Sequence, residues 1–280
     1  MIIAQPFIGF KKTPDREYFA IDLPSSSTTK VLLNGTNAHL AHERDTPRED
    51  NDAFAVGALL HAMVLDPESV ATGFIRAPKC DRRTTAGKAE WEDLSSRATR
   101  NQSRLVSVDL WTQALGMADA IEAHPMAQRL LEMLPMRETA VFGEIAGHQA
   151  KGKIDAASID CEIILDVKTS QSASPREFAR SAATFGYAHQ AAFYRRLTGS
   201  VGCANRDFVF LVVEKAPPYL VACYRLDDAA IEAADKRLDG LIERWIAVQA
   251  GDRTGYPDLV RHINLPAWAL KLEDTQDADC

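Results

Sequence analysis

The sequence has no long hydrophobic run. None of its apolar stretches approaches the ~18 residues that a helix needs to span a bilayer. The N-terminus also lacks the layout of a secretory signal peptide, because Pro6 and the pair Lys11–Lys12 follow only a short apolar start. From these two absences we expect a cytoplasmic protein with no membrane partner.

Cysteine is scarce, and its spacing is irregular. The five cysteines form no Cys-x-x-Cys pair and stand at Cys80, Cys161, Cys203, Cys223 and Cys280. An odd number at such spacing argues against a disulfide framework and against a zinc ribbon. We therefore expect reduced thiols that mostly fill the core.

Basic residues are also fewer than acidic residues, with 32 Lys and Arg against 39 Asp and Glu. The formal net charge is −7, which is the wrong sign for a protein that nucleic acid coats over its whole surface. The segment 76–104 is the exception, because it holds eight Lys or Arg, including Arg82 and Arg83, against four acids. Any DNA contact is expected there, although a solvated helix with internal ion pairs explains the same charges.

What the sequence does contain is an ordinary globular composition. Its 280 residues, 46% hydrophobic and 25% charged, are enough for one large domain or two modest ones. We divide the chain into an extended N-terminal arm (1–24), a helical part (25–135), an α/β core (136–250) and an acidic tail (251–280). We expect helices over 25–42, 51–65, 85–101, 108–123, 126–134, 175–197 and 227–250, with strands over 74–78, 137–145, 206–214 and 219–226 and a central hairpin.

The central hairpin is the stretch Lys151–Thr169, which reads as two short strands joined by a polar turn. The first strand carries Asp155, and the second carries Asp166 and Lys168 where a buried strand should still be apolar. Strand side chains alternate between faces, so Asp166 and Lys168 point the same way. If the strands pair around the turn at 158–160, Asp155 lies across from Asp166.

Two carboxylates and an amine in one patch suit a magnesium site. Mg²⁺ takes one or two protein carboxylates and keeps several waters, and a neighbouring ammonium can stabilise charge on a phosphate. The competing interpretation is a surface hairpin with a cross-strand salt bridge, which an isolated Asp-x-Lys favours. The motif alone leaves both interpretations open.

Other candidate residues carry weaker signals. His61 lies within a predicted helix, where a lone histidine more often packs than binds a ligand. Glu138 and Glu144 share one face of a predicted strand, and either is a possible metal ligand, although charges at strand ends are usually only solvated. Gln190 and Tyr194 lie four apart on one helix face, which is also ordinary spacing for packing residues.

The order of the elements resembles the PD-(D/E)XK nuclease core in its RecB-like branch. That core has a helix, three strands, a helix and a strand, and here Asp155, the Asp166-x-Lys168 motif and Gln190-x-x-x-Tyr194 fall at the matching places. The segment Gly57–His61 followed by Leu65-Asp-Pro67 resembles the Gly-x-x-x-His helix of RecE-type exonucleases (exonuclease VIII). Ser25–Leu33 resembles their Ser-rich helix start, so that the similarity covers about residues 18–200.

The resemblance implies an α/β fold with a PD-(D/E)XK restriction-endonuclease-like core, in which helices flank a mixed central sheet, and an N-terminal helical extension. It also implies roles for particular residues. The catalytic set would be His61, Asp155, Asp166 and Lys168. Asp155 and Asp166 would hold the metal ion with His61 and Glu138 as further ligands, and Gln190 and Tyr194 would support DNA or the site. The ion would be Mg²⁺, for which Mn²⁺ could substitute. The scattered cysteines do not match the iron–sulfur cluster that some RecB-like nucleases carry.

The activity implied by the resemblance is exonucleolytic degradation of double-stranded DNA from its ends, in the 5′-to-3′ direction, for phage-type homologous recombination. The implied partners are DNA ends, a single-strand annealing protein and further copies of the chain, in a ring of three or four with a basic interior. Two alternatives stay open. One is a structure- or strand-specific endonuclease on the same fold, and the other is a catalytically silent DNA-binding or assembly protein.

Overall fold

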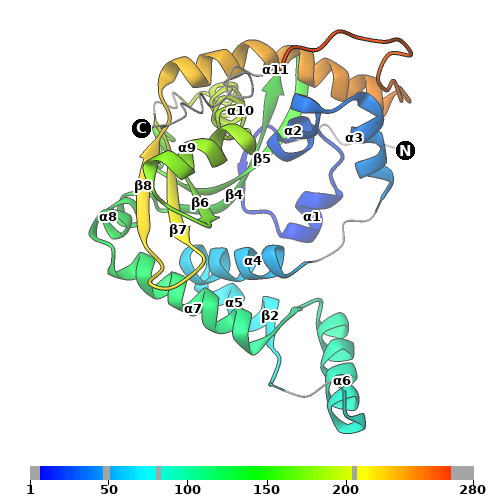
Figure 1. Cartoon of the computed structure of the whole chain (residues 1–280). Coiled ribbons are helices and arrows are strands. Elements are labelled where there is room, and N and C mark those ends of the chain that lie inside the picture. The colour runs from blue at the N-terminus through cyan, green and yellow to red at the C-terminus, as the bar shows by residue number, and fades with distance from the viewer. Residues whose placement is uncertain (1–6, 47–50, 80–82, 204–206, 266–280) are drawn as a thin grey trace, which may run out of the picture.

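A mixed six-stranded sheet forms the centre of the computed structural model (Figure 1). The structure describes residues 7–46, 51–79, 83–203 and 207–265. In spatial order the strands are β1 (Gly9–Lys11), β4 (Met136–Ile145), β5 (His148–Ala157), β6 (Ile163–Ser170), β7 (Asp207–Glu214) and β8 (Val221–Arg225). Neighbouring strands of the described sheet are antiparallel except β6 and β7, which are parallel. The predicted fold class, a mixed sheet flanked by helices, is confirmed.

Helices cover both faces of the sheet (Figure 1). Before β4 they are α1 (Asp15–Ala20), α2 (Ser26–Asn34), α3 (Asn37–Asp45), α4 (Asp52–Leu65), α5 (Pro67–Gly73), α6 (Thr85–Asn101), α7 (Val108–Ala123) and α8 (Pro125–Met133). After β6 they are α9 (Pro175–Thr184), α10 (Tyr187–Gly199) and α11 (Asp228–Gln249). The helices predicted over 51–65, 85–101 and 108–123 are confirmed as α4, α6 and α7.

The sheet separates two apolar cores because its central strands are apolar on both sides. In β7, Phe208, Phe210 and Val212 join the core formed with α9, α10 and α11. Leu211 and Val213 of the same strand face the opposite core, which α4 and α7 complete. A strand buried on both faces reads as one continuous apolar run, as β7 does. The central strands are therefore held on both sides by helices.

Two of the predicted long helices are each divided in two. The helix expected over 25–42 ends at Asn34, and Thr36 caps the start of α3. The helix expected over 175–197 breaks at Gly186, whose φ of +67° is one that side-chain-bearing residues rarely adopt. A Cβ there would also lie 2.7 Å from Cδ1 of Leu33. The break lets α10 start anew and pack against β4 and α2.

The extended arm predicted for residues 1–24 is wrong for the residues that the structure describes. β1 pairs antiparallel with β4, and α1 follows it. Tyr18 of α1 is buried against Ala140 and Phe142 of β4. The prolines that suggested an open arm stand at element boundaries instead, since Pro14 is the N-cap residue of α1 and Pro24 precedes α2. The N-terminal segment is thus part of the sheet.

Helix α6 stands away from the rest of the fold (Figure 1). It connects β2 (Phe74–Arg76) with β3 (Arg104–Val106), which form a parallel pair separate from the main sheet. Arg83 is exposed just before α6, whereas Arg82 lies outside the described residues. The projecting unit of β2, α6 and β3 therefore carries most of the predicted basic segment.

The remaining predictions concern the membrane, the cysteines and the tail. In the described part of the chain, no helix has both the length and the apolar character needed to cross a membrane. In the described part of the chain, Cys161, Cys203 and Cys223 are reduced and not joined in disulfides, which agrees with the prediction. Residues 251–265 of the predicted tail form neither helix nor strand, and residues 266–280 fall outside the described ranges.

Candidate active site

Three carboxylates form a row across neighbouring strands. The register between β4 and β5 pairs Arg137 with Ala156 and Thr139 with Ile154, so Glu138 lies opposite Asp155. The pairs Ala156–Leu165 and Ala157–Ile164 between β5 and β6 place Asp155 opposite Asp166 in the same way. The hairpin predicted from the sequence therefore has the register that was expected, and Glu138 extends its carboxylate pair to three.

The backbone departs from a regular ladder along this row. Pairing between β5 and β6 stops at Ala156–Leu165, and the N–H of Val167 donates to Oδ2 of Asp155 at 2.8 Å. A side-chain carboxylate here replaces a backbone carbonyl, so the two strands separate beside the acidic row. Glu138 has a φ of +43°, a rare and strained conformation for a residue that is not glycine. Such backbone outliers concentrate at functional sites.

His61 of α4 reaches this row from the side. Its Nε2 lies 3.1 Å from the carbonyl oxygen of Val167, a distance at which Nε2 donates a hydrogen bond. Its Nδ1 lies 3.6 Å from Oδ2 of Asp155 and 3.8 Å from Oε1 of Glu138. Among the described residues, His61, Glu138 and Asp155 are the one group of three whose possible ligand atoms all lie within 4.8 Å of one another.

The concentration of negative charge shifts the pKa values of this group. Burial alone would lower the pKa of His61, but Asp155, Glu138 and Asp166 raise it to about 9. Burial raises the pKa of Asp155 to about 7, reinforced by Asp166 and Glu138 and opposed by His61. Burial would also raise the pKa of Glu138, but His61 and Lys153 hold it at about 2. A site that retains protons near neutral pH is one that a cation can stabilise.

We expect metal affinity to increase as the pH rises from 6 to 8. A divalent ion needs an ionised carboxylate and a neutral imidazole, so protons on Asp155 and His61 compete with it. Because their pKa values are about 7 and about 9, this competition weakens across the whole interval. Calorimetric titration with Mg²⁺ should show the dissociation constant falling by more than about tenfold from pH 6 to 7, where both protons compete, and by about tenfold from pH 7 to 8, where mainly the His61 proton competes. An affinity that does not change with pH would contradict this charge arrangement.

Asp166 has different partners from Asp155. Its Oδ2 pairs with Nζ of Lys168, and its Oδ1 accepts a hydrogen bond from Nε2 of Gln190 at 2.5 Å. The Lys168 ammonium also lies over the Tyr187 ring, 5.2 Å from its centroid. Burial would lower the pKa of Lys168, but the carboxylates of Asp166 and Asp155 raise it overall. The structure thus brings four predicted residues, Asp155, Asp166, Lys168 and Gln190, to one place.

Tyr194 supports the site without facing it. Its hydroxyl donates to the carbonyl oxygen of Lys153 at 2.6 Å and accepts from the backbone N–H of Lys153 at 3.1 Å. The side chain is buried, so it fixes the backbone of β5 two residues before Asp155. Glu144, the other predicted glutamate, is exposed opposite Gln149 near the far end of β4 and is outside the group of three.

Two residues of this region, Lys153 and Asp15, were not predicted from the sequence as site residues. Nζ of Lys153 lies 2.6 Å from Oε2 of Glu138 and 2.5 Å from Oδ1 of Asp15. Burial would lower the pKa of Lys153, but Glu138 and Asp15 raise it overall. Lys153 stands two residues before Asp155 on one strand, and this same-face spacing is a signal that sequence reasoning could have used. Asp15 has no comparable signal, because the docking of α1 brings it there.

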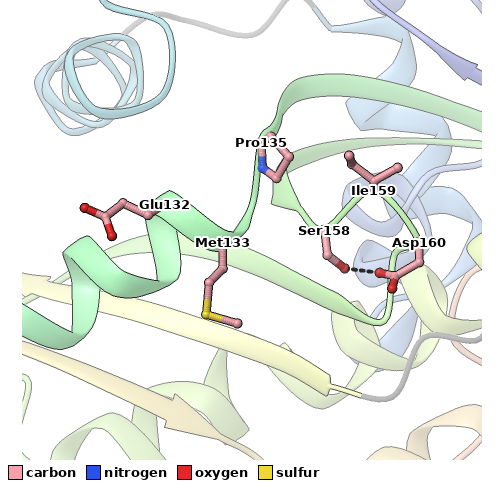
Figure 2. Close-up of a pocket in the computed structure, with 6 residues that line it drawn as sticks. All are labelled: Glu132, Met133, Pro135, Ser158, Ile159 and Asp160. Carbon is pink, nitrogen blue, oxygen red and sulfur yellow. Dashed lines mark hydrogen bonds between the residues drawn. The ribbon is translucent and has the colours of Figure 1, made fainter.

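A shallow hollow nearby is a different feature (Figure 2). It is lined by Glu132, Met133, Pro135, Ser158, Ile159 and Asp160. The hydroxyl of Ser158 donates to Oδ1 of Asp160 at 2.5 Å, which stabilises the turn between β5 and β6. The lining contains no residue of the acidic row, so the hollow does not belong to the candidate active site.

Comparison with protein families decides the family. The family described as "PDDEXK-like domain of unknown function (DUF3799)" matches residues 25–260. The chain belongs to this PDDEXK-like family. The match covers the whole of the acidic row, His61 and Lys168, and most of the described sheet. Comparison with curated proteins gave no match.

One solved structure shows the same fold as this PDDEXK-like chain. A candidate exonuclease from Eubacterium rectale is 14% identical with a TM-score of 0.63, over 91% of this chain and 96% of that one. A phage-related exonuclease from Haemophilus somnus 129PT is also 14% identical, with a TM-score of 0.35, over 82% of this chain and 96% of that one. At this identity the first similarity shows a shared fold, and the second is too weak to add to it.

Proposed function

We propose that this protein is a metal-dependent deoxyribonuclease that degrades double-stranded DNA from its ends, in the 5′-to-3′ direction. The observation that carries the proposal is the group His61, Glu138 and Asp155, with ligand atoms within 4.8 Å of one another. Lys168 lies close enough to Asp155 to affect its pKa, and the group joins two strands and helix α4 of a PDDEXK-like domain. The first test is degradation of linear DNA with Mg²⁺ and its loss when a chelator is added.

The donor set suits a divalent cation. Carboxylate oxygens are the ligands that Mg²⁺ prefers, and an imidazole nitrogen is also accepted by Mn²⁺. Because Nε2 of His61 already contacts Val167, Nδ1 is the nitrogen available to an ion. We propose that Glu138, Asp155 and His61 hold Mg²⁺, or Mn²⁺ in its place, with Asp166 as the third carboxylate beside them.

The remaining polar residues have roles that follow from their contacts. A bound divalent ion supplies positive charge at the scissile phosphate and makes water a stronger nucleophile at neutral pH. Lys168 keeps its proton, because its pKa is raised, and its ammonium can stabilise negative charge as water attacks the phosphorus. Asp166 fixes Lys168 through their ion pair, and Gln190 fixes Asp166 through its amide. Tyr194 holds the β5 backbone from behind.

Replacing His61 with alanine should separate a ligand from a packing residue. We expect cleavage to fall by about 10- to 100-fold, because one metal ligand is lost, and the melting temperature to change little. Met63→Ala on the same helix is the matched control, since Met63 packs against the apolar core that α4 and α7 complete. It should lower the melting temperature and keep the turnover of the folded fraction. A lower melting temperature with near-normal cleavage for His61→Ala would show that His61 packs in the core and does not bind the metal ion.

We propose that DNA is bound along the projecting unit of β2, α6 and β3, and that the chain acts as a ring of three or four copies together with a single-strand annealing protein. A net charge of −7 gives little general attraction for DNA, so the surplus of Lys and Arg in the segment 76–104 supports this location for DNA binding. Light scattering of the purified chain should give a trimer or tetramer, and a monomer would contradict the ring.

Charge reversal at Arg82 and Arg83 should weaken DNA binding without harming the metal site. Phosphate contacts made by such residues should also give an affinity that falls steeply with added salt. Arg129→Glu is the matched control, because Arg129 is exposed on α8, far from α6 in Figure 1. Fluorescence anisotropy with duplex DNA, in parallel with Mg²⁺ titration, checks both points. Equal weakening per reversed charge by the Arg82/Arg83 pair and by the control would show that the effect comes from net charge alone.

A further inference from the structure

Lys153 lies between two carboxylates at the edge of the candidate metal site. Its ammonium contacts Glu138, whose side chain is 18% exposed, and Asp15, whose side chain is 65% exposed. At N–O distances of 2.6 Å and 2.5 Å, Lys153 forms an ion pair with each of the two carboxylates. The contact with Lys153 fixes Oε2 of Glu138. The other oxygen, Oε1, lies 3.8 Å from Nδ1 of His61.

An ammonium in that position has two opposed effects on a divalent ion. It orients the Glu138 carboxylate, which favours binding, because a ligand held in place loses less freedom when the ion arrives. It also repels the ion, and that repulsion is twice the repulsion between two unit charges at the same separation. A second carboxylate that pairs with the ammonium, and that is outside the group of candidate metal ligands, reduces the repulsion without disturbing the orientation. Asp15 is that carboxylate.

We propose that Asp15 neutralises Lys153, so that Lys153 orients Glu138 without repelling the metal ion. Asp15 and Lys153 are then positioning residues, and the N-terminal segment completes the active site. This inference rests on the proposed metal site. It assigns a function to a segment that precedes the family match at residues 25–260.

The fold holds Asp15 where this role requires it. Nζ of Lys151 donates to the carbonyl oxygens of Tyr18 and Ile21, each at 2.6 Å, and so fixes the C-terminal end of α1. The Tyr18 side chain is buried under the sheet, and its ring lies 4.4 Å from the Lys151 ammonium. Lys12 donates to the carbonyl oxygen of Arg137 at 2.8 Å, directly before Glu138. The helix is attached at both ends, although Asp15 itself is exposed.

The test measures Mn²⁺ binding by calorimetry without DNA, using the full chain. We compare the wild type with Asp15→Asn, Lys153→Met and the double variant. Asp15→Asn should weaken Mn²⁺ binding by about tenfold, because the Lys153 charge is then uncompensated. In the Lys153→Met background the same change should alter the affinity by less than about twofold. Glu17→Gln, which removes an exposed charge from the same helix, is the matched control and should also stay within about twofold.

Three outcomes would overturn the inference. One is an Asp15→Asn affinity equal to that of Glu17→Gln, and another is an equal loss with and without Lys153. The third is a wild-type chain that binds no Mn²⁺, or whose Mn²⁺ binding survives Asp155→Asn. The proposed function is judged separately by cleavage: a chain that binds Mn²⁺ and shows the expected coupling, yet never cuts DNA, refutes the nuclease and retains the role of Asp15.

Discussion

Replacing Asp155 with asparagine is expected to reduce DNA cleavage by at least about 100-fold while leaving the fold intact. Asparagine keeps an oxygen that can accept the hydrogen bond from Val167, but it removes the charge that a metal ion needs. Burial and the neighbouring carboxylates raise the pKa of Asp155, so removal of its charge also relieves repulsion. The melting temperature without metal should therefore stay level or rise.

The same measurement with Mg²⁺ distinguishes a metal ligand from a structural residue. A ligand that binds only the native state raises the melting temperature, so Mg²⁺ should stabilise the wild type and not Asp155→Asn. Asp160→Asn is the matched control, because Asp160 is exposed in the turn after the same strand. It should keep both the Mg²⁺ response and the cleavage. Asp166→Ala, which leaves Lys168 and Gln190 without their shared partner, should lose cleavage as well.

Undiminished Mg²⁺-dependent cleavage by a folded Asp155→Asn or Asp166→Ala protein would refute the site. A lower melting temperature without metal would show instead that Asp155 is stabilising in the native state. The hydrogen bond to Val167 would then outweigh the repulsion from Glu138 and Asp166.

Covalently closed plasmid is expected to survive conditions that consume the same plasmid after linearisation. An acidic chain that binds duplex DNA only along a confined basic unit has little affinity for DNA in general. In a ring of copies that unit would line a channel, which admits an end and excludes a closed circle. The expected difference is therefore close to all-or-none, and the assay is gel electrophoresis of both forms over time with Mg²⁺.

Three controls make this result interpretable. A chelator should protect both forms of the plasmid, and added salt should slow degradation of the linear form steeply. End-labelled linear DNA, labelled on the 5′ or the 3′ end, gives the direction. Rapid conversion of closed circles to nicked or linear forms by Asp155-dependent activity would contradict the exonuclease and favour the endonuclease alternative.

The acidic hairpin could be predicted from the sequence because its signal is local. A strand alternates its faces, so charged residues at Asp166 and Lys168 within an apolar run stand out against the core positions between them. The pairing register follows from a short turn. His61 carries no such signal, since it lies 106 residues before the carbonyl of Val167 that it contacts, and only the resemblance to a known family selected it.

The contacts that sequence reasoning missed depend on packing between distant segments. Asp15 contacts Lys153, 138 residues away in the chain, because α1 docks on β4 and β5. No sequence pattern near Asp15 predicts that docking. Similarly, Gly186 breaks a helix whose amphipathic pattern continues through it. The pattern of apolar residues reports which face is buried, and the backbone conformation at one glycine decides where the next helix points.

The span of these contacts along the chain has a consequence for the order of assembly. Glu138, Asp155 and Asp166 belong to one antiparallel meander, whose strands meet through short turns and so close early. His61 contacts Val167 of this meander only after a loop of 106 residues has closed. The three carboxylates are thus gathered before His61, which balances part of their negative charge. A divalent cation present during refolding can take that place, so Mg²⁺ should speed the late steps of folding as well as serve the finished site.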